Sequence, residues 1–150
     1  MEKYLENLNN HYKSLTGMDL SISQLATIRT LVFSDTAIRH KIDNSLPQEY
    51  LQNALVWHDV IVLAFNYHYT ITSGYRCPEL NKKVGGVSTS LHQKALAVDF
   101  NVGNCSGGLM KSFFLMDLAQ LLIPYKLEIK YHYMRDNMLH VELKYMKGGV

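Results

Sequence analysis

The sequence predicts an α+β domain, in which helices pack on one face of a small, mostly antiparallel sheet and the other face forms a cleft. Two observations carry this prediction. Apolar residues recur at helical spacing over residues 46–66, and two segments near the C-terminus alternate polar and apolar residues as half-buried strands do. The 150 residues contain no repeat and no linker-like tract, so we expect a single domain over residues 1–150.

The first 45 residues indicate short helices separated by turns. Ser45 and Gln48 have the spacing of a capping box, and Pro47 is tolerated in a first helical turn, which predicts an amphipathic helix over 46–66. The residues at helical spacing on its apolar face are Leu51, Leu55, Val62 and Phe65.

The middle of the chain predicts shorter elements. "YTIT" at 69–72 indicates a strand, and "PELNKKV" a brief helix that the following "GG" ends. "LAVDFNV" at 96–102 alternates as a strand does, and residues 108–122 predict a helix that Pro124 closes.

The segments "YKLEIKYHY" and "MLHVELKY" predict a hairpin, with "RDN" as its turn. A three-residue loop at 135–137 would place His132 opposite His140, side by side on one face. A one-residue slip would pair polar with apolar side chains, which disfavours it. The same register creates two favourable pairs of opposite charge, Lys130 with Glu142 and Glu128 with Lys144.

Charge and composition narrow the possible partners and compartments. The formal net charge of +2 and the scattered lysines exclude a nucleic-acid partner. Cys77 and Cys105 form no disulfide framework, so we expect two free thiols. The N-terminus lacks the apolar core of a secretory signal, and the longest apolar run, 60–65, is too short to span a bilayer. We therefore expect synthesis in the cytoplasm, no membrane insertion and a monomer.

Three residues have the types that a catalytic zinc site uses. Such a site takes three ligands from His, Asp or Glu and leaves a fourth position for water. His92 lies in a loop, Asp99 in the strand that follows, and His140 in a separate strand. The spacing H-x6-D also arises by chance in a chain with 7 His, where such residues are surface or hydrogen-bonded side chains. On spacing alone, both interpretations stay open.

The stretch "SGYRCPELNKKVGGVSTSLHQKALAVDF" at 73–100, with the later "LHVE", is far more specific. It resembles the signature S-G-Y-R-[ST]-P-x-x-N-x-x-V-G-G-x-x-x-S-x-H-x-x-G-x-A-x-D of the zinc D-Ala-D-Ala carboxypeptidase family. That superfamily includes phage L-alanyl-D-glutamate endolysins, D,D-dipeptidases and the hedgehog zinc domain. The resemblance covers residues 20–145 and implies a zinc peptidase.

The resemblance also implies roles for individual residues. His92, Asp99 and His140 would bind one zinc ion in the cleft. Arg76 would face a substrate carboxylate, which suits its planar, permanently charged guanidinium. Ser90 would hydrogen-bond the substrate or a neighbour of the metal ligands. The residues that would shape the surrounding loops are Tyr75, Asn81, Gly85 and Gly86.

The chain departs from the signature at three positions. Cys77 replaces Ser or Thr, and Ala95 replaces a Gly, which is tolerable unless the backbone there needs a positive φ. Relatives also place a Glu a few residues before the last His, where it activates water. Asn137 stands three residues before His140 and cannot act as a base.

Two residues are therefore candidates for the catalytic base. His132 lies opposite His140 in the predicted register, and a neutral imidazole accepts a proton near pH 7. Glu142 points to the same face, although the register pairs it with Lys130. Asp136 would reach the cleft only if the turn folded back, and alternation directs Tyr131 toward the core.

The predicted function is a zinc metallopeptidase that hydrolyses peptidoglycan stem peptides, either at D-Ala-D-Ala or at an L-Ala-D-Glu type bond. A small chain of this kind suggests a phage or prophage lysis enzyme, which waits in the host cytoplasm and acts on the cell wall after release. The alternative is a zinc-bearing, catalytically inactive peptidoglycan-binding or virion module, for which the missing Glu argues.

Overall fold

A four-stranded antiparallel sheet organises the protein in a computed structural model that describes residues 2–104 and 107–147. Cys105, predicted as a free thiol, lies outside these residues, and Cys77 is free. The strands follow the order β1-β2-β4-β3 across the sheet. Their bounds are Thr70–Ser73 for β1, Ala97–Asn101 for β2, Leu127–Arg135 for β3 and Met138–Tyr145 for β4.

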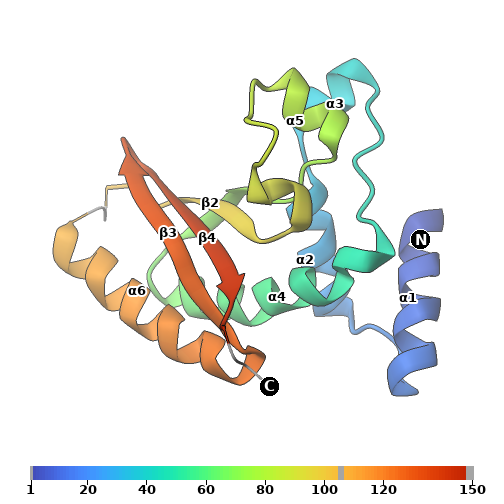
Figure 1. Ribbon diagram of the computed structural model, residues 1–150, viewed down its shortest axis with the longest axis horizontal. Helices are drawn as coiled ribbons and strands as arrows, with labels where there is room; N and C mark the ends of the chain where they lie inside the picture. Colours follow the sequence, from blue (N-terminus) through green and yellow to red (C-terminus); the bar gives the residue numbers. More distant parts are fainter. Residues whose placement is uncertain (1, 105–106, 148–150) are drawn as a thin grey trace.

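Two long helices, α4 (Leu51–Asn66) and α6 (Gly108–Leu122), pack on one face of this sheet (Figure 1). Helix α2 (Ile22–Val32) packs against α4 and β1, and α1 (Lys3–Thr16) lies at the far end of the molecule from the sheet (Figure 1). The remaining short elements are α3 (Asp35–His40), α5 (Pro78–Lys83) and three 3-10 turns, η1 (Gln48–Tyr50), η2 (Leu91–Lys94) and η3 (Ile123–Tyr125). The predicted α+β class is confirmed.

Strand alternation separates the core from an open face. Val98 and Phe100 of β2 are fully buried beneath the helices, where the ring of Phe100 contacts Trp57 and Phe114 edge to face. Residues of the opposite parity, such as Asp99, face away from α4 and α6. We call that side the open face; it carries Asp99 from β2 and His140 and Glu142 from β4. The predicted cleft over it stays a prediction.

The predicted helix over 46–66 is confirmed as α4, but its start and its buried face differ from the prediction. Ser45 makes no capping box, because its hydroxyl donates to Asp43 Oδ1 at 2.5 Å instead. Val62 and Phe65 are 62% and 75% exposed. The residues that face the core are Leu51, Ala54, Val56, Trp57, Val60 and Ala64. The small Ala54 and Ala64 are buried while the larger Val62 and Phe65 are not, and such a fit of side-chain size cannot be read from hydrophobicity alone.

A capping box forms instead at the start of α2. The Ser21 hydroxyl accepts from the backbone N–H of Gln24, and the Gln24 side chain accepts from the backbone N–H of Ser21. This reciprocal pair satisfies two amide donors at the start of α2. Among the described residues, no helix combines the length and apolar character that a membrane crossing requires.

The β3–β4 hairpin turns in two residues, Asp136 and Asn137, instead of the predicted three. Asp136 has φ 53°, the left-handed conformation that tight hairpin turns require and that Asp tolerates. The predicted register is therefore wrong by one residue near the turn. Tyr133, and not His132, lies opposite His140.

A β-bulge at Lys130 explains why only one of the two predicted charge pairs forms. Beyond the bulge, Glu128 pairs with Lys144 as predicted, with 3.4 Å between the carboxylate and the ammonium group. On the turn side, Tyr131 occupies the place opposite Glu142 that was predicted for Lys130. The bulge turns Tyr131 onto the open face, whereas alternation alone predicted that it would point to the core.

Ala95, which replaces the Gly of the signature, adopts a positive φ of 56°. This conformation costs an L-residue roughly 1–2 kcal/mol. Ala95→Gly removes that strain but also loses a buried methyl group, about 0.8 kcal/mol, and adds backbone entropy to the unfolded state. We expect these terms to cancel, so that Ala95→Gly changes the free energy of unfolding by less than about 0.5 kcal/mol.

The matched control is Ala97→Gly, because Ala97 is equally buried but lies in the extended strand β2. It has no such strain to relieve, so we expect a loss of about 1.5 kcal/mol. Urea denaturation of both variants measures the difference. Equal losses in the two variants would contradict a strained backbone at Ala95.

Candidate metal centre

Asp99 and His140 lie directly opposite each other on neighbouring strands β2 and β4. Paired residues share one face of a sheet at short range, so their side chains meet on the open face. His92 arrives separately, from the η2 turn that precedes β2. One ligand atom from each of the three residues lies within 4.8 Å of the others. The sequence-predicted ligand set is therefore brought together.

Local hydrogen bonds hold the His92 ring in one orientation. Its Nδ1 lies 2.6 Å from the carbonyl oxygen of Gly74, an acceptor only, so Nδ1 carries the proton and donates. Its own carbonyl oxygen accepts from the backbone N–H of Arg76 at 3.0 Å. Only glycine fits at position 74, because a Cβ on Gly74 would lie 2.8 Å from the backbone of Leu31 in α2. The SGYR segment and the His92 turn thus brace each other.

In the tautomer that carries its proton on Nδ1, Nε2 of His92 is the acceptor nitrogen, and it is turned toward Asp99. The atom is buried and has no hydrogen-bond partner among the described residues, with Asp99 Oδ2 3.6 Å away. A buried polar atom without a partner is costly, and a metal ion would satisfy it. Its Nδ1–H bond to a carbonyl is the arrangement that metal-binding histidines use.

Asp99 sits between the two histidines as the negative member of the group. Its Oδ1 lies 2.6 Å from Nδ1 of His140. Burial alone would raise the pKa of Asp99, but the hydrogen bond from His140 and the nearby His92 outweigh it and hold the pKa below the usual range. The carboxylate of Asp99 is therefore ionised in the neutral pH range and can bind a cation.

The His140 ring is held at both nitrogens and on one face. Nδ1 contacts Asp99, and Nε2 lies 2.9 Å from Glu142 Oε2. The ring of Tyr133 stacks on the imidazole with centroids 4.9 Å apart. Burial lowers the pKa of His140, but the hydrogen bonds to Asp99 and Glu142 raise it more, so the net pKa lies above its ordinary value.

These residues fit a zinc ion. The donors are two imidazoles and one carboxylate, the set that leaves a zinc coordination position open. His92 would contribute the orphaned Nε2 and Asp99 a carboxylate oxygen. His140 would contribute Nδ1, because this atom faces Asp99 while Nε2–H donates to Glu142. Glu142 would then orient a ligand in the manner of a carboxylate–histidine–zinc triad.

Arg76 lies at the edge of the group, with its guanidinium 3.8 Å from Asp99 Oδ2. Burial lowers the pKa of Arg76, against which the charge of Asp99 acts, but the group stays protonated in the neutral range. The buried amide of Asn81 accepts from Arg76 at 3.2 Å and donates to the carbonyl of Val87. A Cβ on Gly86 would lie 2.1 Å from Asn81 Oδ1. Gly86 is therefore needed so that Asn81 can position Arg76.

Ser90 and Cys77 both act as caps of short helical segments. The Ser90 hydroxyl accepts from the backbone N–H of His92 at 3.3 Å, so it stabilises the turn that carries this ligand. The Cys77 sulfur accepts from Leu80 N–H at 3.4 Å at the start of α5. Thiol sulfur is a weaker acceptor than the hydroxyl of the signature, so the replacement is compatible but less stabilising.

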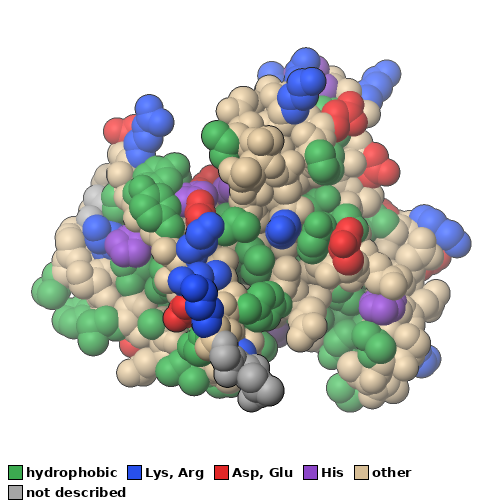
Figure 2. Space-filling model, in the orientation of Figure 1, with side chains coloured by type: hydrophobic (Ala, Val, Ile, Leu, Met, Phe, Trp, Pro, Cys, Tyr) green, Lys and Arg blue, Asp and Glu red, His purple; other side chains and the backbone are tan. Residues whose placement is uncertain are grey.

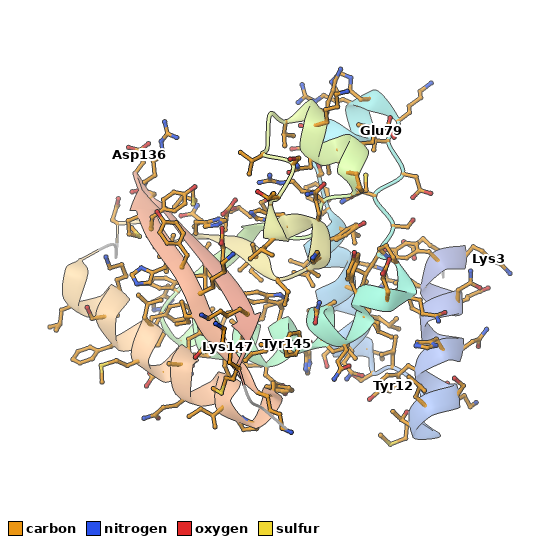
Figure 3. The ribbon with its side chains drawn as sticks, in the orientation of Figure 1. Lys3, Tyr12, Glu79, Asp136, Tyr145 and Lys147 are labelled. Carbon is orange, nitrogen blue, oxygen red and sulfur yellow. The ribbon has the colours of Figure 1, made fainter. Side chains whose placement is uncertain are left out.

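Of the candidate bases, His132 does not lie near the group of His92, Asp99 and His140. His132 lies opposite Val141, whose side chain is in the core, so it is on the reverse face from His140 and is exposed to solvent. Asp136 projects outward from the hairpin tip (Figure 3). Glu142 is the sequence candidate that contacts the group, through its hydrogen bond to His140.

Sequence reasoning missed Tyr133 and the site-facing position of Tyr131. Tyr133 stacks on His140, and the two tyrosine rings lie 5.8 Å apart. The two-residue turn and the bulge at Lys130 decide their face. The DN dipeptide favours a tight turn and was the one available signal, since the position of a bulge leaves no comparable mark in a sequence.

Fold and site together define a small α+β domain with a candidate mononuclear metal centre. The sequence model of the Peptidase M15 family matches residues 24–142, most of the chain, and the protein belongs to this family. This is the zinc D-Ala-D-Ala carboxypeptidase family, whose members are zinc-dependent, so the resemblance is confirmed. Neither the comparison with curated proteins nor that with solved structures found a match.

Zinc affinity should fall as the pH drops, because a proton on His140 competes with the metal. The raised pKa of His140 stabilises the metal-free fold below pH 6.5, and this stabilisation is lost as the pH rises through the folded-state pKa. As the pH is lowered, proton competition therefore begins at a pH above 6.5. Below the folded-state pKa of His140 we expect zinc affinity to fall about tenfold per pH unit. Chelator competition from pH 8.5 to about 5.5 measures it.

Glu142→Gln provides the matched comparison for this titration. Its neutral amide keeps a hydrogen-bond acceptor near His140 but removes the negative charge, so the onset should move to lower pH. An affinity that stays constant over the whole range would exclude His140 as a ligand.

Proposed function

We propose that this protein is a zinc-dependent peptidase that cleaves the stem peptides of bacterial peptidoglycan, as a phage or prophage lysis enzyme. Membership of the Peptidase M15 family supports the peptidase. The observation that carries the proposal is the buried group of His92, Asp99 and His140 on the open face, with Arg76 beside it. Stem peptides fit because their free carboxylates suit the guanidinium at the edge of this group.

The three ligands and Arg76 divide the work of binding. His92, Asp99 and His140 would hold the ion, which when bound supplies Lewis-acid chemistry for polarising a peptide carbonyl and activating water. Arg76 would bind the substrate carboxylate, which also draws this side chain away from Asp99. Asn81 keeps the guanidinium aimed at the open face.

Glu142 is the residue that we propose as the proton acceptor. Its side chain is 22% exposed on the open face, and only Oε2 is engaged by His140. Because Oε2 holds Nε2, on the other side of the ring from Nδ1, the other carboxylate oxygen would take a proton from the attacking water through one intervening water and return it to the leaving amine. Glu142 would thereby replace the upstream Glu of relatives, whose place in this chain, Asn137, is in the hairpin turn.

The biological setting is part of the proposal. The protein would be made in the cytoplasm, act as a monomer on the cell wall after release, and bind peptidoglycan peptide as its partner without nucleic acid or membrane insertion.

The zinc-loaded protein should release peptides from purified peptidoglycan, and His92→Ala should abolish the release because it removes one of three metal donors. Mass spectrometry of the products identifies the bond. Zinc content measured in parallel separates a failure to bind metal from a failure of catalysis. Stoichiometric zinc without any product would reject the peptidase and favour the inactive binding or virion module.

Two variants locate the proton acceptor. Glu142→Gln should keep zinc, because the amide oxygen still accepts from His140, but should lower kcat by about 10²- to 10⁴-fold. His132→Ala should leave kcat within about twofold, since His132 lies on the opposite face from His140. The reverse result in steady-state kinetics would assign the base to His132.

A further inference from the structure

Two tyrosines on the open face have large exposed rings beside the metal centre. Tyr131 is 53% and Tyr133 39% exposed, and their ring centroids are 5.8 Å apart. Figure 2 shows hydrophobic side chains over the β3–β4 hairpin, next to His and acidic side chains of the open face. Exposed aromatic area at a functional site marks a binding surface more often than an isolated exposed residue does.

The bulge at Lys130 is what places both tyrosines on this face. It leaves Lys130 without a partner residue on β4 and so weakens the strand pairing locally. Bulges next to active sites re-aim side chains, and this one selects the parity that shows Tyr131 to the open face. A regular strand with the pairing found beyond the bulge would have shown Lys130 and His132 instead.

The tyrosines extend the metal centre in one direction, across the strands. Arg76 follows β1 in the chain, and its guanidinium lies 3.8 Å from the carboxylate of Asp99 on β2. Asp99 contacts His140 on β4, whose ring stacks on Tyr133 of β3. The row thus runs from a cation on one side of the candidate ligands to a neutral aromatic pair on the other.

We propose that Tyr131 and Tyr133 bind the acyl side of the substrate, meaning the part on the N-terminal side of the bond that is cut. This inference rests on the proposed function. With Arg76 on the carboxylate of the leaving side and the scissile bond over the ligands, the acyl side lies on the tyrosines. They are uncharged and flat, so they suit alanine methyl groups and the C–H face of the attached sugar ring. Tyrosine provides such contact area at low cost in conformational entropy.

Tyr131 is the better residue to test, because Tyr133 also holds the ring of a metal ligand. Substrates that share one leaving side but have acyl sides of increasing length should respond differently to Tyr131→Ala. We expect about a tenfold loss of kcat/KM for the longest, mainly through KM, and less than about twofold for the shortest. Tyr131→Phe should restore the longest substrate, since the ring makes the contact.

Tyr145→Ala is the matched control for folding. Tyr145 is 48% exposed and lies at the end of β4 away from the hairpin tip (Figure 3). It should not change the ratio between long and short substrates. A uniform loss at every acyl length in Tyr131→Ala would indicate a merely structural role and overturn the proposal, as would no loss at all.

Binding of acyl-side products provides a readout that needs no turnover. N-acetylmuramyl-L-alanine and the muramyl tetrapeptide are the probes, titrated into zinc-loaded wild type and Tyr131→Ala by calorimetry. Weaker binding of at least one probe in the variant supports the tyrosine surface even if the protein hydrolyses nothing, in which case only the proposed peptidase fails. If the wild type is active and Tyr131→Ala binds both probes as tightly as the wild type does, the tyrosine surface is rejected while the proposed peptidase is supported.

Discussion

The contact between Asp99 and His140 is the constraint on which the rest of the site depends. It exists because β2 and β4 are neighbours in the sheet and pair in a register that sets these two residues opposite each other. Their side chains can meet on the open face only if residues of the opposite parity, such as Phe100 and Val141, are buried under α4 and α6. Core packing thus holds the register, and the register holds Asp99 and His140 together as candidate ligands.

The third candidate ligand needs a different kind of support, because His92 lies in a turn and not in the sheet. The indole N–H of Trp57 donates to the carbonyl oxygen of Ala95 at 2.8 Å, which joins α4 to the end of this turn. On the other side the His92 ring donates to Gly74. The left-handed backbone of Ala95 is the cost of bringing the chain from the turn into β2 so abruptly.

Asn137 and Glu142 show that the fold decides which polar side chain lies beside the candidate metal centre. Asn137 falls in the two-residue hairpin turn and is exposed to solvent. Glu142, in contrast, lies on the open face, and its carboxylate contacts His140. The ring of Tyr133 stacks on the face of the His140 imidazole and so supports this candidate ligand in addition to the contacts at its two ring nitrogens.

The sequence by itself determined the fold class, the order of the main elements and the three candidate ligands, because hydrophobic periodicity and the 73–100 signature are local properties. Only the tertiary structure decided which face of α4 is buried, where Val62 and Phe65 proved exposed. It also decided the hairpin register, which removed His132 from the open face and put Tyr131 on it. Both outcomes follow from packing between distant segments, and a one-residue bulge inverts every side chain beyond it without leaving a signal in the sequence.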